Sequence, residues 1–206
     1  MRITLATLAS SFVASALALV AAAPQDAAAP TKAAIGQAAP AFTLKGADGK
    51  TYNLADYKGK TVVLEWFCAT CPVSGNGEDS YWGSGSASKT IAAVSAADAT
   101  AVYLSIDSSK NGSSESNAAV VSKAGQSTPM LMDADGKVGR SYGAKTTPHV
   151  FIVDGTGTLV YMGAPASDDG KTNYIVNAVT AIKGGKPVEP ATTRNKGCGI
   201  KYASKG

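Results

Sequence analysis

The amino-acid sequence predicts an α/β domain at residues 35–185, with a central mixed β-sheet flanked by helices and an N-terminal β-hairpin. Two apolar runs rich in β-branched residues, at 61–67 and 101–106, are typical of strands buried on both faces. Segments of helical composition or spacing follow these runs, and two later runs at 150–162 form a proline-led hairpin. Strands alternating with helices predict a sheet covered on both faces.

The first 34 residues are predicted to lie outside this domain. Arg2, the apolar run 3–20 and the alanines that follow have the three-part layout of a secretory signal peptide, assigned to residues 1–23. A retained membrane anchor is the alternative, which the small-residue cleavage site and the missing charged flank disfavour. Residues 24–34 are predicted to be a flexible Ala/Pro leader. We therefore expect an exported protein, periplasmic or secreted, without stable membrane insertion after cleavage.

The domain is predicted to begin with a hairpin and to continue into its central strand. The short runs 42–44 and 52–54 flank an Asp-Gly turn, which is a strong hairpin signal. After the strand at 61–67, Cys71-Pro72 predicts a helix start, because proline is tolerated at the first helical position. Four glycines between residues 75 and 85 oppose a long helix, so we expect a short helix, a loop and a second helix at 87–97.

The remaining elements follow from spacing, caps and turns. Serines at 108–114 can cap a helix, and the apolar spacing from Ile175 to Ile182 stops at Gly184-Gly185, which is a typical helix ending. The predicted elements are a helix at 115–124, a strand at 130–132, a helical turn at 138–142, strands at 150–153 and 158–162, a C-terminal helix at 175–182 and a basic tail at 186–206.

Composition limits the classes of function. The chain has 206 residues, of which 45 % are apolar and 17 % charged, so it can bury a core and is not predicted to be disordered. The net charge is +4, and the basic tail lacks interleaved aromatic residues, so we expect no nucleic-acid partner. Three cysteines are an odd number for a structural disulfide framework in an exported protein.

Two residues of the central segment point to chemistry. Cys71 follows the strand and would start a helix, where free N–H groups and the helix dipole lower the pKa of a thiol. Glu65 lies inside an apolar run, where a carboxyl is costly unless it is paired or neutral. The alternative for Glu65 is a glutamate at the end of the sheet that reaches solvent or a lysine.

The order of elements, the Cys-Pro pair and a later Thr-Pro before a strand resemble the thioredoxin-like fold. Residues 35–67, IGQAAPAFTLKGADGKTYNLADYKGKTVVLEWF, resemble the redoxin branch of that fold, which includes peroxiredoxins of the alkyl hydroperoxide reductase and thiol-specific antioxidant family. The tail sequence GCGIKY resembles the ends of secreted redoxin-domain proteins. The resemblance covers residues 35–185 and implies an antioxidant or oxidoreductase.

The resemblance implies roles for the cysteines. Cys71 matches the attacking cysteine of a thioredoxin-type CxxC motif, while Ser74 stands where the second cysteine is expected. Cys68 or Cys198 is left as the possible resolving thiol. Whether Cys68 can bridge to Cys71 depends on their α-carbons lying within about 7 Å.

The resemblance also implies roles for three other residues. Glu65 stands six residues before the attacking cysteine, where thioredoxins carry a buried acid that relays a proton. Thr147-Pro148 resembles the cis-proline loop, which binds an extended substrate through backbone hydrogen bonds.

The leading hypothesis is thiol-disulfide exchange, with Cys71 attacking a disulfide or sulfenic acid. Its partners are a protein disulfide or thiol substrate and an external thiol reductant, and we expect no cofactor and no metal. The first alternative is a peroxiredoxin-like thiol peroxidase that reduces a peroxide. The residues at the family's proline, threonine and arginine positions are Leu64, Cys68 and Pro148, so this sequence lacks all three.

Two further alternatives involve no catalysis. Cys68, Cys71 and His149 carry the thiolate and imidazole groups that suit copper, although a lone histidine is more often a packing residue. The chain can also be read as a structural domain without redox chemistry.

Overall fold

The structure is a computed structural model that describes residues 32–204. The predicted signal peptide and residues 24–31 of the predicted leader lie outside the described residues. The last part of that leader contacts the domain, since the Ala33 N–H donates to the carbonyl of Ser141 at 2.8 Å. Among residues 32–204, no helix is long and apolar enough to cross a membrane.

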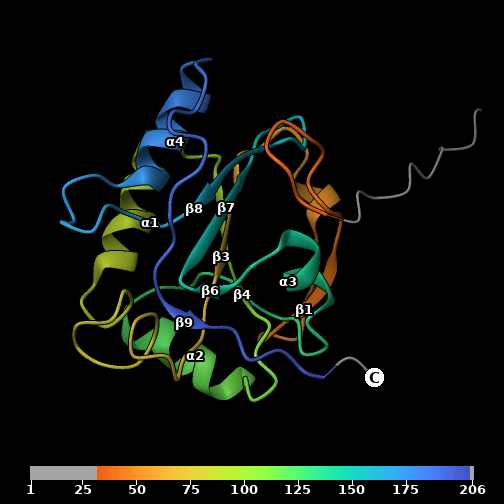
Figure 1. Cartoon of the computed structure of the whole chain (residues 1–206), viewed down its shortest axis with the longest axis vertical. Helices are drawn as coiled ribbons and strands as arrows, with labels where there is room; N and C mark the ends of the chain where they lie inside the picture. The colour runs from red at the N-terminus through yellow and green to blue at the C-terminus, as the bar shows by residue number, and fades with distance from the viewer. Residues whose placement is uncertain (1–31, 205–206) are drawn as a thin grey trace, which may run out of the picture.

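A seven-stranded mixed sheet forms the centre of the molecule, in the order β2-β1-β5-β4-β3-β7-β8 (Figure 1). β3 and β4 pair in parallel, as do β4 and β5, whereas β7 runs antiparallel to β3. The predicted mixed sheet and the predicted N-terminal hairpin, β1 with β2, are confirmed. The strands are β1 (Thr43–Gly46), β2 (Thr51–Asn53), β3 (Val62–Trp66), β4 (Val102–Asp107), β5 (Met130–Met132), β7 (His149–Val153) and β8 (Leu159–Gly163).

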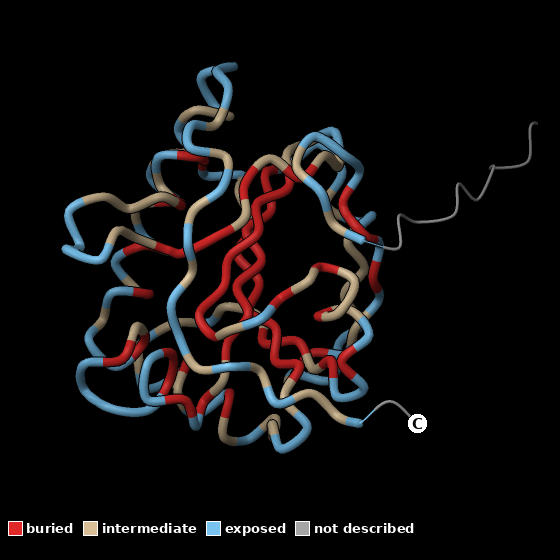
Figure 2. Tube along the Cα trace, viewed as in Figure 1, coloured by how far each residue is buried: buried red, intermediate tan, exposed pale blue. Residues whose placement is uncertain are grey.

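Helices cover the two faces of this sheet. Side chains of β3 alternate between the faces, so Val63 packs with Val94 of α1 and Val179 of α4, while Trp66 packs with Tyr142 of α3. Figure 2 shows the central strands as the buried part of the molecule. The helices are α1 (Ser86–Ala97), α2 (Ser114–Lys123), α3 (Lys137–Tyr142) and α4 (Tyr174–Lys183), with a 3-10 turn at Leu54–Tyr57.

The predicted helix start at Cys71-Pro72 is wrong. The chain makes one turn there, in which the N–H groups of Gly75 and Asn76 both donate to the carbonyl of Cys71 at 2.9 and 2.8 Å. The first helix is α1, which begins at Ser86. The glycines explain the difference, because a Cβ on Gly75 would lie 2.6 Å from the carbonyl oxygen of Cys68. This segment folds back on the strand end instead of continuing as a helix.

The C-terminal tail returns across the end of the sheet. After α4 it passes beside β8, where Thr192 pairs with Met162, and then forms β9 (Cys198–Gly199) on the short strand β6 (Thr146–Thr147), as Figure 1 shows. The predicted basic tail therefore lies on the domain as a strap.

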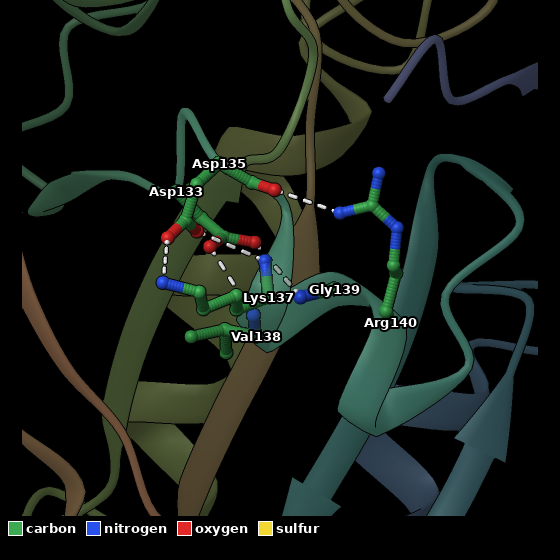
Figure 3. A network of polar contacts seen from close by, with 6 residues as sticks. All are labelled: Asp133, Asp135, Lys137, Val138, Gly139 and Arg140. Carbon is green, nitrogen blue, oxygen red and sulfur yellow. Dashed lines mark hydrogen bonds and ion pairs between the residues drawn. The ribbon is translucent and has the colours of Figure 1, made fainter. Parts of the chain in front are cut away.

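The far end of this strap contacts α3, whose hydrogen-bonded start is shown in Figure 3. The Asp133 carboxylate accepts the N–H groups of Val138 and Gly139 at 3.2 and 2.8 Å, and Arg140 donates to the Asp135 carbonyl at 2.7 Å. The Arg140 guanidinium also lies 4.7 Å from the ring centroid of Tyr202 in the tail. The end of the tail thus contacts a helix whose start is held by these hydrogen bonds.

Candidate functional site

A cavity of about 230 Å³ brings the three cysteines together. Its walls come from residues 68–72, which follow β3, from Ser109 and Asn111 after β4, from Thr147, and from residues 198–201 of the tail. The sequence placed Cys68 and Cys71 near each other, but only the folded tail adds Cys198. All three are free thiols in the structure.

The Cys71 side chain is buried and only 4 % exposed. As a thiol it donates to the carbonyl oxygen of Thr147 at 3.6 Å, across the cavity from its own loop. Burial raises the pKa of Cys71, but hydrogen bonds from the Cys198 thiol and from the Thr147 side chain, followed by peptide N–H groups of the turn at 73–74, bring this pKa below its usual value. The peptide N–H groups of residues 73 and 74 therefore help to lower the pKa of Cys71, as the start of a helix was predicted to do.

Cys198 lies opposite Cys71 because β9 pairs its backbone with that of Thr147. Burial raises the pKa of the Cys198 thiol, and a hydrogen bond with Cys71 raises it further. The two thiols therefore have pKa values on opposite sides of the ordinary value. The pair is suited to a reaction in which one sulfur is the nucleophile and the other stays protonated until it is needed.

Cys68 occupies a tight turn that is hydrogen-bonded to a buried residue of α2. The Cys71 N–H donates to the Cys68 carbonyl at 3.2 Å, and the Cys68 sulfur lies 3.4 Å from the Thr70 hydroxyl. Within this turn, the Ala69 N–H donates to the side-chain oxygen of Asn117 at 3.3 Å. Asn117 is fully buried, and its side-chain amide donates to the Asp107 carboxylate at 2.8 Å. These partners of the Cys68 turn are not predicted from the sequence, although a polar residue among the apolar positions of a helix is a signal for them.

Glu65 is fully buried on the α1 and α4 side of β3. Its two oxygens accept hydrogen bonds from the Trp82 indole at 3.0 Å and the Tyr103 hydroxyl at 2.9 Å. The alternative of a glutamate reaching solvent or a lysine is thus wrong. Burial raises the pKa of Glu65 to about 7 despite these hydrogen bonds. The carboxyl of Glu65 can therefore change its protonation state near neutral pH, on the strand that leads to Cys71.

Ser74 stands where the second cysteine of a CxxC motif would be. It is fully buried, and its hydroxyl has no hydrogen-bond partner. The position therefore faces the interior and offers no sulfur to Cys71, which leaves Cys68 and Cys198 as the thiols at the cavity.

The loop opposite Cys71 has the geometry that the resemblance implies. The Thr147-Pro148 peptide bond is cis, and Thr147 is buried. The backbone of Thr146 and Thr147 is paired with the tail, as an extended peptide would be.

His149 is a packing residue. Its ring lies 4.5 Å from that of Phe151, and its Nδ1 accepts the Lys145 N–H at 3.3 Å. Burial lowers the pKa of His149 to about 4, and the nearby Lys145 charge acts in the same direction. Within residues 32–204, no group of three or more His, Cys, Asp or Glu side chains is arranged to bind a metal ion.

The positions compared with peroxiredoxins carry no peroxide-activating groups. Leu64 is a fully buried core residue. Neither Arg140 nor Arg194, the arginines within the described residues, lines the cavity with Cys71.

The fold and the cysteine cavity define a redoxin of the thioredoxin fold. A sequence model of the AhpC/TSA family matches residues 35–162, which is more than half of the chain. The chain therefore belongs to the AhpC/TSA family. A comparison with curated protein sequences found no match.

Solved structures support the fold. A hypothetical protein from Sinorhizobium meliloti 1021 is 24 % identical with a TM-score of 0.71, and the match covers 84 % of this chain and 96 % of that one. An uncharacterized conserved protein from Geobacillus kaustophilus is 25 % identical with a TM-score of 0.67, covering 84 % and 94 %. A secreted disulfide oxidoreductase from Mycobacterium tuberculosis is 18 % identical with a TM-score of 0.50, covering 70 % and 95 %.

Proposed function

We propose that this protein is an exported thiol-disulfide oxidoreductase in which Cys71 is the attacking thiolate and Cys198 the resolving thiol. The observation that carries the proposal is the placement of both cysteines at Thr147: the Cys71 thiol donates to its carbonyl oxygen, and the backbone of Cys198 pairs with it. The two thiols share a hydrogen bond, and the pKa is lowered for Cys71 and raised for Cys198. Export is supported by the signal-like sequence 1–23.

The first step is attack of the Cys71 thiolate on a substrate disulfide. A bond forms between the Cys71 sulfur and one substrate sulfur, the substrate S–S bond breaks, and the second substrate sulfur leaves as a thiolate. Thr147 and the cis Pro148 position an extended substrate beside Cys71 in this proposal.

The second step is attack by Cys198. Besides burial, the hydrogen bond with Cys71 and the charge of Cys71 raise the pKa of Cys198. Both of these influences disappear once the Cys71 sulfur is bonded to the substrate, so the Cys198 thiol loses its proton more easily. The substrate thiolate that departs from Cys71 can accept this proton. The Cys71–Cys198 disulfide forms as the substrate sulfur leaves. Two thiol groups of an external reductant then reduce this disulfide by two successive exchange steps and are themselves oxidised to a disulfide.

Glu65 is proposed as a proton reservoir rather than a group that touches the sulfurs. Its hydrogen bonds go to Trp82 and Tyr103, and its pKa of about 7 allows proton exchange near neutral pH.

Disulfide mapping of the oxidised full chain by mass spectrometry tests the proposal. We expect a Cys71–Cys198 bridge with Cys68 free, and we expect Cys71→Ser to abolish reduction of a disulfide substrate. A Cys68–Cys198 bridge that leaves Cys71 free would contradict the resolving step. Hydrogen peroxide consumption is measured in parallel, and peroxide turnover that depends on Cys71 and exceeds disulfide turnover would favour the peroxidase alternative.

A further inference from the structure

The tail crosses the candidate site as an added strand. Cys198 pairs with Thr147 and Gly199 with Thr146 in antiparallel register, and the Ile200 N–H donates to the Lys145 carbonyl at 2.9 Å. At Gly197, one residue before this strand, the tail lies too close to the backbone of Thr147 to leave room for a side chain. The chain's own segment thus occupies the edge that an extended peptide would use.

The two glycines that flank Cys198 differ in their surroundings. A Cβ on Gly197 would lie 2.2 Å from the carbonyl oxygen of Thr147, and the φ angle of Gly197 is 155°. A Cβ on Gly199 would meet nothing within 4 Å. Only the position before the cysteine therefore requires glycine.

We propose that residues 195–200 are a tethered substrate peptide, and that external substrates are extended segments whose cysteine is preceded by glycine. This inference rests on the proposed function. One edge cannot pair with two strands, so the tail leaves the Thr146–Thr147 edge when a substrate binds. It then returns with Cys198 to complete the exchange.

Contacts on both sides of the segment keep it near the site while it exchanges. Before it, Thr193 donates its N–H to the carbonyl of Met162 at 3.2 Å, and beyond it the Tyr202 hydroxyl donates to the Ala144 carbonyl at 2.6 Å. A segment attached at both sides competes with free peptides at the high effective concentration that tethering provides.

Synthetic peptides test the position before the cysteine. The probe is the sequence of residues 194–202, RNKGCGIKY, with its cysteine in a mixed disulfide with thionitrobenzoate, whose release is coloured. The full chain with Cys198→Ser isolates the first step. We expect the probe carrying Gly197→Ala to react about tenfold more slowly, because overpacking in a close contact is costly. The matched probe carrying Gly199→Ala should react within about twofold of the original.

A control reagent separates failure of this inference from failure of the proposed function. It is the symmetric disulfide of thionitrobenzoate, which can react with a thiolate but has no peptide backbone to pair with Thr146–Thr147. If it reacts with Cys71 while the three peptides react at equal rates, the inference is wrong and the proposed function stands. If Cys71 reacts with neither the peptides nor this reagent, the proposed function is wrong as well.

The same pair of substitutions in the full chain tests the tail directly. Gly197→Ala should slow oxidation to the Cys71–Cys198 disulfide several-fold and speed Cys71 alkylation, whereas Gly199→Ala should change neither. Thermal melts monitored by circular dichroism show whether both variants fold. Equal oxidation and alkylation rates in two folded variants would overturn the assignment of the tail as a substrate mimic.

Discussion

Cys68 and Cys198 both line the cavity of Cys71, but different kinds of structure hold them there. Cys68 lies on a turn bonded to Asn117, which is fully buried and bonded in turn to Asp107. Cys198 lies on a tail held by a two-residue strand and by contacts nearer the surface. We call these the fixed half and the tail half of the site. Because a resolving thiol must move toward a mixed disulfide, the tail half is better suited to supply it.

The largest expected effect separates the two cysteines. Cys198→Ser should slow the release of the substrate thiol that is bonded to Cys71 in the mixed disulfide by about 100-fold or more, because it removes a tethered nucleophile. Cys68→Ser should leave that release nearly unchanged. Quenched-flow reaction with a disulfide peptide, analysed by mass spectrometry, measures both. If Cys68→Ser stops resolution and Cys198→Ser does not, the fixed half supplies the resolving thiol.

The next effect concerns pH and the buried carboxyl group of Glu65. The pKa of Glu65 is about 7 in the folded state against 4.5 for an ordinary glutamate, so the folded state retains this proton longer. Its contribution to stability is fully present below pH 4.5 and is lost as pH rises through 7, by about 3 kcal/mol. Urea unfolding between pH 4.5 and 8 measures it.

The matched variant for this measurement is Glu65→Gln, which keeps the shape of the side chain but cannot ionise. The free energy of unfolding should fall less steeply with rising pH in the variant, because the variant lacks the contribution of Glu65 ionisation. Equal slopes in the two proteins would mean that Glu65 titrates normally.

A smaller loss of stability is expected at Asn117. Asn117→Ala removes the hydrogen bonds of Asn117 with the Ala69 N–H and with Asp107, so these buried groups lose that partner. The free energy of unfolding should fall by about 2 kcal/mol. The exposed Asn177 of α4 is the matched control, and Asn177→Ala should change the free energy of unfolding by less than about 0.5 kcal/mol. Chemical denaturation compares them, and equal losses would show that the fixed half is not fixed by this network.

The smallest effects concern the attachment of the tail. Arg140→Ala removes a contact with Tyr202 and should slow formation of the Cys71–Cys198 disulfide about threefold, since a partly exposed cation–aromatic contact contributes about 0.5–1 kcal/mol. Lys196→Ala breaks an exposed ion pair with Asp168 and should change that rate by less than about twofold. Oxidation kinetics of the reduced full chain check both, and the opposite order would place the main tail anchor at Lys196.

Much of the fold could be predicted from the sequence because local patterns specify it. The apolar run 61–67 contains β3, and Ser113 caps α2 as the serine-rich loop suggested. The helix start at Cys71-Pro72 failed because glycine packing overrode the local signal of proline. Strand β9 could not be predicted, since its two residues are extended only by pairing with Thr146–Thr147, far away in the sequence.

The candidate site was predictable in part. Cys71, Cys68 and Cys198 do share one cavity, and Thr147-Pro148 does lie opposite Cys71. The partners of Glu65 were not predictable, because Trp82 and Tyr103 reach it from separate segments. Long-range side-chain contacts of this kind leave no periodic trace in a sequence.

The hydrogen bond between the Trp82 indole and Glu65 gives the protein an internal optical reporter. The chain has two tryptophans, and the indole of the other, Trp66, bonds to the neutral Ser108 hydroxyl at 2.9 Å. Only the Trp82 indole therefore bonds directly to a group that gains or loses charge near neutral pH. The emission of Trp82 should follow the ionisation of the buried acid in the intact protein, without any attached dye.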